Sequence, residues 1–142
     1  MTRGFTLVEM VVVLVILGVT AAAVVPALTR LTPEDGTLPT AHRVERVLTF
    51  ARAMALERAT AVEVIVSPQD ARIWLRTDSA TIDSGVIDLD SGVTLSSSAV
   101  RPRVRFAPTG SAVADSLIVL GPPSPVPISV NAWTGEVHAR RP

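Results

Sequence analysis

A carboxylate, Glu9, directly precedes the longest apolar stretch of this sequence. The 19 residues from Met10 to Leu28 carry no charge. At about 1.5 Å per residue, a helix of that length spans the hydrocarbon layer of a bilayer. A charge that enters the membrane costs about 2.5–3.5 kcal/mol on insertion scales, and more if it is held near the centre without a partner. We therefore predict a membrane-spanning helix in which Glu9 needs a cationic partner.

An alternative interpretation of the same stretch is a secretory signal peptide. Ala21 and Ala23 supply a small-residue cleavage pattern, so the mature chain would begin at Val24. However, the apolar run is longer than the roughly 7–15 residues of a signal core, and Pro26 lies inside it. These features favour the membrane span.

The order Gly4-Phe5-Thr6-Leu7-Val8-Glu9, placed directly before an apolar span, resembles the processing site of the type IV pilin and type II secretion pseudopilin superfamily. The resemblance implies that a prepilin peptidase cuts between Gly4 and Phe5. It also implies that the Phe5 amine is N-methylated and that Glu9 guides assembly with other pilins or pseudopilins. The protein would then lie in the inner membrane as a single-pass protein with its carboxyl-terminal head in the periplasm.

The chemistry of such a processed end is consistent with assembly. A free amine on Phe5 would be largely protonated near neutral pH, with a reference pKa of about 7.7–8.0, and methylation leaves it basic. Glu9 could neutralise this amine within one helix or between neighbouring helices. Only pairing between subunits would drive filament growth, and this is the hypothesis we adopt.

Two residues inside the apolar run favour bending. Gly18 and Pro26 stand where members of the superfamily tend to have a helix-loosening glycine and proline, and both weaken local helical hydrogen bonding. Ordinary tolerance of such residues in membrane helices is the alternative. The predicted organisation is a leader at 1–4, a transmembrane helix at 5–28, a linker at 29–40 and a head at 41–142.

The head is predicted to be α+β, with one amphipathic helix packed on an antiparallel sheet. From 41 to 59, apolar residues recur every three or four positions, including Val44, Leu48, Ala51 and Ala55, which is typical of a helix packed on a sheet. Short apolar segments separated by Gly, Pro, Asp and Ser turns predict antiparallel strands. The predicted strands are 62–66, 71–75, 86–89, 93–95, 103–107, 117–120, 128–130 and 136–139.

Three head segments, 51–59, 104–110 and 128–137, resemble one branch of the superfamily. This is the branch of the H-type minor pseudopilins (GspH) and their FimT-like counterparts in type IV pili. The resemblance implies a minor subunit of a type II secretion pseudopilus, which exports proteins across the outer membrane. The alternative it leaves open is a minor type IV pilin that binds DNA for uptake or supports pilus assembly.

Enzymatic and metal chemistry find little support in the sequence. There is no cysteine, no nucleophile elbow and no phosphate-binding glycine loop, and His42 and His138 are far apart in the chain. The segment 88–92 is similar to the start of a calcium loop, but Ala99 occupies the position where an EF-hand needs its bidentate glutamate. We expect no catalysis, no cofactor and no metal.

Charge is balanced overall, with 13 basic and 13 acidic residues, which argues against a general nucleic-acid binder. It is unevenly distributed, because residues 60–95 carry six acids and two arginines, whereas 96–142 carry five arginines and two acids. Arg101, Arg103 and Arg105 alternate and would share one face of a strand. With Arg140 and Arg141 they could contact DNA or an acidic neighbour. A solvated sheet face is the simpler alternative.

Overall fold

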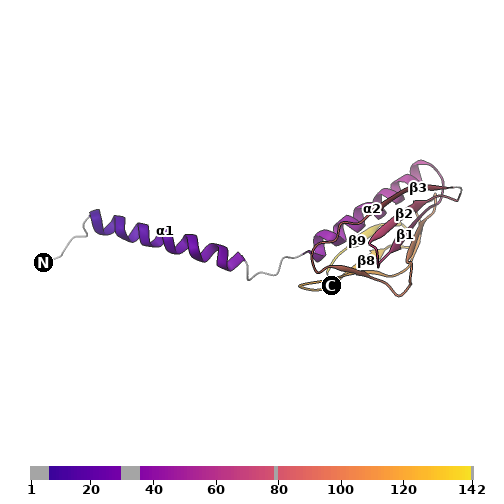
Figure 1. The fold of residues 1–142 in the computed structure, drawn as a ribbon. Coiled ribbons are helices and arrows are strands. Elements are labelled where there is room, and N and C mark those ends of the chain that lie inside the picture. Colours follow the sequence, from indigo (N-terminus) through magenta and orange to yellow (C-terminus); the bar gives the residue numbers. More distant parts are fainter. Residues whose placement is uncertain (1–6, 30–35, 79, 142) are drawn as a thin grey trace. The chain divides into compact units, whose positions relative to one another are not determined.

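The structure, a computed structural model, describes residues 7–29, 36–78 and 80–141, and for 21–29 it describes the backbone alone. The chain divides into two compact units, Met1–Glu34 and Asp35–Pro142 (Figure 1). The predicted cleavage and methylation residues, Gly4 and Phe5, lie outside the described residues. Each unit is considered separately below.

The first unit contains helix α1 (Leu7–Thr29). Its side chains from Leu7 to Thr20 are all exposed within the unit, and all of them except Glu9, Gly18 and Thr20 are apolar. Among the described residues, no helix combines the length and the hydropathy needed to cross a membrane. The membrane span over 5–28 therefore stays a prediction.

The second unit, the head, begins with helix α2 (Thr37–Glu57). The helix starts four residues before the predicted position, Ala41, and so takes in part of the predicted linker. Pro39 does not prevent this, because a proline in the first turn of a helix lacks only an N–H that would have no helical partner there. Ala59, at the end of the predicted helix, lies beyond α2 with a φ of 49°.

Nine short strands in two antiparallel sheets make up the rest of the described head. The five-stranded sheet has the order β3-β2-β1-β5-β6, and the four-stranded sheet has the order β4-β7-β8-β9. The strands are β1 (Val62–Ser67), β2 (Arg72–Arg76), β3 (Thr81–Val86), β4 (Thr94–Ser96), β5 (Arg103–Phe106), β6 (Ala112–Ala114), β7 (Leu117–Leu120), β8 (Val126–Val130) and β9 (Val137–Ala139).

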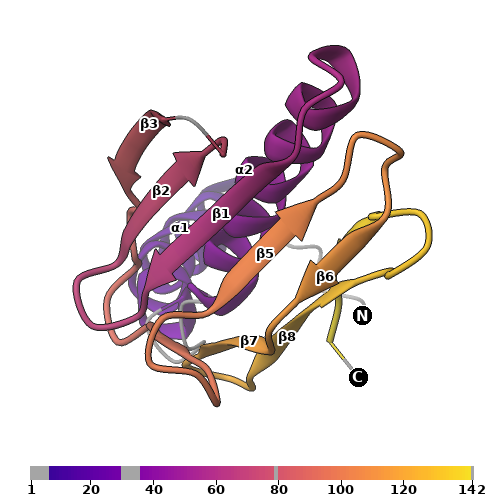
Figure 2. The ribbon, with the colours of Figure 1, turned by 90° about the vertical axis from the view of Figure 1, so that its right-hand side faces the viewer.

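The core of the head lies where α2 covers both sheets. Figure 2 shows α2 behind β1 and β5, and it also packs on β7, β8 and β9. The predicted apolar stripe is the buried face, since Val44, Leu48, Ala51 and Ala55 are fully inaccessible to solvent. The two alanines let the sheet approach the helix closely, and Phe106 fills the space from β5. The predicted α+β class with antiparallel pairing is confirmed.

Two strands differ from the prediction. The segment 86–89 was predicted as a strand, but only Val86 belongs to one. The strand instead runs through Asp83-Ser84-Gly85, whose residue types are those predicted to form the turns between strands. This strand, β3, is an edge strand held by backbone pairing to β2, so its polar residues face solvent without penalty. The three-residue strand β6 was not predicted.

Candidate functional site

Glu9 lies in the first described turn of α1, between strongly exposed apolar neighbours. A carboxylate is favoured near a helix amino terminus, where backbone N–H groups point outward. The described face around Glu9 carries apolar side chains such as Val8 and Val12 and therefore suits an apolar environment. Pairing of Glu9 with the Phe5 amine involves residues outside the described part of the chain.

The two predicted flexibility residues do not interrupt α1. The helix runs continuously through Gly18 and Pro26. A Cβ atom added at Gly18 would meet nothing within 4 Å, so this glycine is not required by packing within its own unit. The proposed role in bending stays a prediction.

Of the alternating arginines of 101–105, Arg103 and Arg105 share one face of β5 as predicted, whereas Arg101 precedes the strand. Arg103 and Arg105 are exposed on β5, whereas Val104 between them is buried. Both are partnered by carboxylates, Arg103 with Glu63 at 3.8 Å and Arg105 with Asp78 at 3.2 Å. Their charge is therefore partly neutralised within the head.

Two further arginines extend this surface. The register pairs Glu63 with both Arg105 and Arg76, and Ser67 with Arg72, so the β2 arginines lie on the same side of the sheet. Arg101 lines a hollow of about 210 Å³ together with Arg76 and Trp74. We call this surface the arginine face; it comprises Arg72, Arg76, Arg101, Arg103 and Arg105. The alternation in Arg72-Ile73-Trp74-Leu75-Arg76 is a sequence signal that could have predicted the part of the arginine face that β2 contributes.

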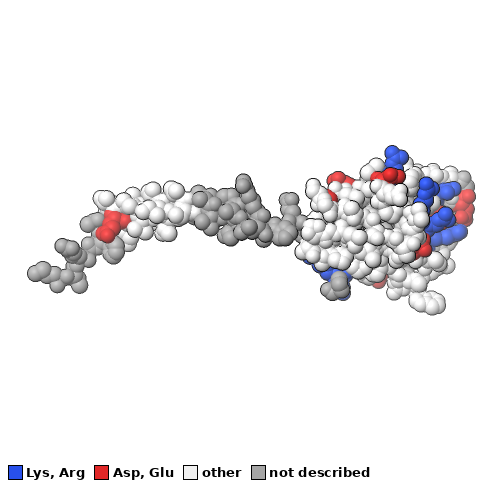
Figure 3. All heavy atoms as spheres, turned by 60° about the horizontal axis from the view of Figure 1, so that its bottom comes forward, with Lys and Arg blue, Asp and Glu red and all other residues white. Residues whose placement is uncertain are grey.

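The predicted contribution of Arg140 and Arg141 is separate from that face. Both follow β9, the edge strand of the four-stranded sheet, whereas the arginine face belongs to the five-stranded sheet. Figure 3 shows basic and acidic side chains interspersed on the side of the head that it displays. The structure therefore does not join the five predicted arginines into one strip.

Two sequence motifs of the predicted branch come together beside α2. The turn that ends in Gly110 packs against the turn that contains Gly135. Arg52 of α2 fixes the second turn, because its Nε donates a hydrogen bond to the Thr134 carbonyl at 2.8 Å. A backbone bond from Ala112 N to Ala132 O, at 2.9 Å, links β6 to the same turn. The contact connects the two sheets at the carboxyl-terminal part of α2.

A polar cluster fixes the opposite end of α2 to the loop 87–93. The Arg43 guanidinium donates to Asp90 Oδ2 at 2.9 Å and to the Asp88 carbonyl at 3.0 Å, while the Thr40 hydroxyl donates to the Asp90 carboxylate at 3.0 Å. These bonds from Arg43 and Thr40 lower the pKa of the Asp90 carboxyl below its ordinary value. The carboxylate that the sequence placed in a calcium-like segment thus holds α2 and this loop together.

This cluster predicts a pH dependence of stability. Because the pKa of Asp90 is lowered from 3.8 in the folded head, the stabilisation is present above that value. It is lost as the pH falls through the lower, folded-state pKa. Asp90→Asn is therefore expected to lower the melting temperature by a few degrees near pH 7. Its deficit should shrink as the pH falls below 3.8 and through the lower, folded-state pKa, where wild-type Asp90 also becomes protonated.

Thermal melts followed by circular dichroism at several pH values test this prediction. Asp88→Asn is the matched control, since Arg43 bonds the Asp88 backbone carbonyl and not its carboxylate. A deficit of Asp90→Asn that stays constant from neutral to acid pH would contradict the ionic role of Asp90.

Comparisons with known proteins agree with this geometry. Residues 1–25 match the model of the prokaryotic N-terminal methylation motif, and residues 40–134 match that of the type II transport protein GspH. A comparison with curated proteins gave no match.

The fold is similar to that of a solved minor pilin. Two crystal structures of the type IV minor pilin FimU from Pseudomonas aeruginosa match with TM-scores of 0.61 and 0.57, at 10% and 11% identity. The first match covers 74% of this chain and 88% of FimU, and the second covers 72% and 91%. At this identity the likeness establishes a pilin-like fold.

Proposed function

Because this chain belongs to the family of the type II transport protein GspH, we propose that it is a minor pseudopilin of a type II secretion pseudopilus. In this proposal the prepilin peptidase cuts between Gly4 and Phe5, and the Phe5 amine is then N-methylated. The mature chain is held in the inner membrane by residues 5–28, with its head in the periplasm, until it enters the filament.

The observation that supports the proposal best is the combination of two matches in one chain. A methylation motif covers residues 1–25, and a GspH head follows over 40–134. A head of this kind without a processed apolar stem could not join a filament whose core is built from such stems. The role is structural, because subunits of this family act by packing against other pilins or pseudopilins.

Mass spectrometry of the mature amino terminus tests the proposal. The full-length gene is expressed in a host with a prepilin peptidase, and the membrane fraction is analysed. We expect a chain that begins at Phe5 and carries one added methyl group on its amine. A soluble chain that begins at Val24 would instead establish the signal-peptide alternative and reject the proposal.

A second candidate function, DNA binding by a minor type IV pilin, is favoured by the arginine face. Single-stranded DNA would place phosphates on the arginines and stack bases on Trp74, which lines hollows on two sides with Arg72 and with Arg76 and Arg101. Neutralisation of Arg103 and Arg105 by carboxylates weakens this candidate. Titration of the full chain in detergent with DNA discriminates, because the candidate requires binding that weakens steeply with salt.

A further inference from the structure

Strand β3 is the longest of the four edge strands in the described head. It has six residues, whereas the other edge strands, β4, β6 and β9, have three each. Five of the six are exposed, and none is a lysine, an arginine or a proline. Natural edge strands are usually kept short or carry such residues, because an unpaired edge accepts a strand from another chain. Of the edges described, β3 is therefore the best suited to strand addition.

The register of β3 identifies the backbone groups that have no strand beside them. The Ile87 N–H donates to the Ala71 carbonyl at 2.7 Å, so Ile87 faces β2, and every second residue before it does the same. The N–H and C=O groups of Ser84 and Val86 consequently point away from β2. Within the described residues, the Ser84 N–H bonds only to the carboxylate of its neighbour Asp83, at 2.8 Å. We call this row of outward groups the β3 edge.

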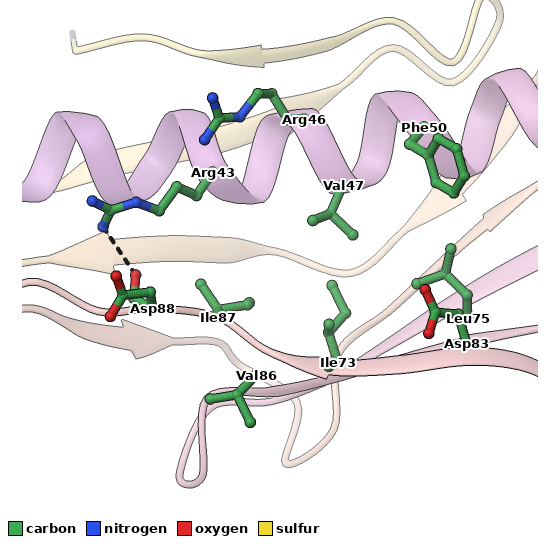
Figure 4. Close-up of a pocket in the computed structure, with 11 residues that line it drawn as sticks. Arg43, Arg46, Val47, Phe50, Ile73, Leu75, Asp83, Val86, Ile87 and Asp88 are labelled. Atoms are coloured by element: carbon green, nitrogen blue, oxygen red, sulfur yellow. Dashed lines mark hydrogen bonds between the residues drawn. The ribbon is translucent and has the colours of Figure 1, made fainter.

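A hollow of about 460 Å³ between α2 and the strands β2 and β3 gives an added strand room for side chains. Its floor, formed by Ile73, Leu75 and Ile87, is already buried in the core. Its rim is open, because Phe50 of α2 is 56% exposed and lies across from β3 (Figure 4). Gly85 on the rim has no positive φ, and a Cβ atom added to it would meet nothing within 4 Å. A strand glycine without such a role is typical of a site that another backbone approaches closely.

Charge indicates what kind of segment fits the β3 edge. The register places Arg72 across from Val86 and Arg76 across from Thr81. Both arginines are exposed and form no ion pair with any residue that the structure describes. A strand added beside β3 would lie about 10 Å from β2, a distance that an arginine and an acidic side chain can bridge. Two identical β3 edges would instead bring arginines of both copies together, which disfavours a second copy of this chain.

We propose that the β3 edge receives an extended segment of a different minor pseudopilin, which adds a sixth strand to the five-stranded sheet. Backbone pairing to Ser84 and Val86 holds this segment. Its side chains alternate, with acidic residues on the side of Arg72 and Arg76 and apolar residues over Phe50. A contact with an unlike neighbour suits a minor subunit. The inference rests on the proposed function and assigns the surface by which the head joins that neighbour.

Photocrosslinking in membranes tests the contact. The full-length chain is produced together with the other minor pseudopilins of the same host, each with its own tag, and a photoreactive phenylalanine analogue replaces Ser84. We expect a crosslink to one of these subunits that is roughly tenfold or more stronger than with the analogue at Val113. Val113 is an exposed residue on β6, the other edge strand of the same sheet.

Substitutions at Val86 and Arg72 make the result specific. Val86→Pro removes an N–H that points away from β2, so the head should still fold while the crosslink falls roughly tenfold or more. Val86→Thr keeps the N–H and the branched shape and should crosslink as the parent chain does. Arg72→Glu should weaken the crosslink, whereas Arg72→Lys should retain it. The melting temperature of each variant is measured by circular dichroism.

Three outcomes overturn the proposal. They are a crosslink no stronger than that from Val113, a crosslink between copies of this chain, and a crosslink indifferent to Val86→Pro in a folded head. If Val86→Pro itself unfolds the head, an effect of Arg72→Glu equal to that of Arg72→Lys overturns the proposal instead.

Failure of this inference can be told apart from failure of the proposed function. The amino terminus of the chain in the same membranes is read by mass spectrometry. A methylated Phe5 without the crosslink leaves the proposed function intact and rejects the strand addition. Absence of processing at Gly4 rejects the proposed function itself.

Discussion

Replacing Glu9 by Gln is expected to reduce incorporation of the chain into a filament by roughly a hundredfold or more. In the proposed assembly, Glu9 of one subunit neutralises the Phe5 amine of a neighbour in an apolar core. Removing one partner of a buried ion pair costs about 3–5 kcal/mol, because the remaining charge is left uncompensated. Each 1.4 kcal/mol corresponds to a factor of ten. Quantitative immunoblotting of sheared filaments against the membrane pool measures the effect.

Two controls separate assembly from folding. Glu57→Gln makes the same chemical change at an exposed position at the end of α2 and should incorporate normally. Glu9→Asp retains the charge and should recover part of the incorporation. Because Glu9 and the core of the head belong to different compact units, the head of Glu9→Gln should melt at the wild-type temperature. Undiminished incorporation of Glu9→Gln would reject pairing between subunits.

Elements governed by local periodicity were predictable from the sequence. The buried stripe of α2 follows from helical spacing, and β1, β5 and β7 follow from short apolar segments between turns. Strand β3 was not predictable in this way, since its residues are polar and its position depends on backbone pairing with β2. The start of α2 was missed because Pro39 and its neighbours are typical of a loop as well as of a first helical turn.

The candidate surfaces also have a part that was predictable from the sequence and a part that was not. Arg103 and Arg105 lie on one face of a strand because side chains alternate along a single strand, and this was predictable from the sequence. The addition of Arg72 and Arg76 requires the strand register, and the separation of Arg140 requires knowledge that β9 belongs to the other sheet. The exposure of Trp133 also depends on tertiary packing. Long-range pairing therefore decided which predicted residues form a common surface.

Gly135→Ala is expected to destabilise the head by about 2–5 kcal/mol. The residue has a φ of 65°, a left-handed conformation that costs an alanine about 1–2 kcal/mol. A methyl group there would also collide with the Gly110 carbonyl and approach the Arg52 side chain at 3.3 Å. Overpacking of this kind adds about 1–3 kcal/mol. For a domain of this size, the melting temperature should fall by roughly 10 °C or more.

Comparison with Gly92→Ala separates the cost of the close contact at Gly135 from the conformational cost of placing alanine in a left-handed conformation. Gly92 has a φ of 76°, but a Cβ atom added there would meet nothing within 4 Å. It should therefore lose only the conformational part, about 1–2 kcal/mol. Equal melting temperatures for the two variants would show that the turns of Gly110 and Gly135 do not need their close approach. A larger loss at Gly135 should also displace Trp133, because the same turn carries both residues.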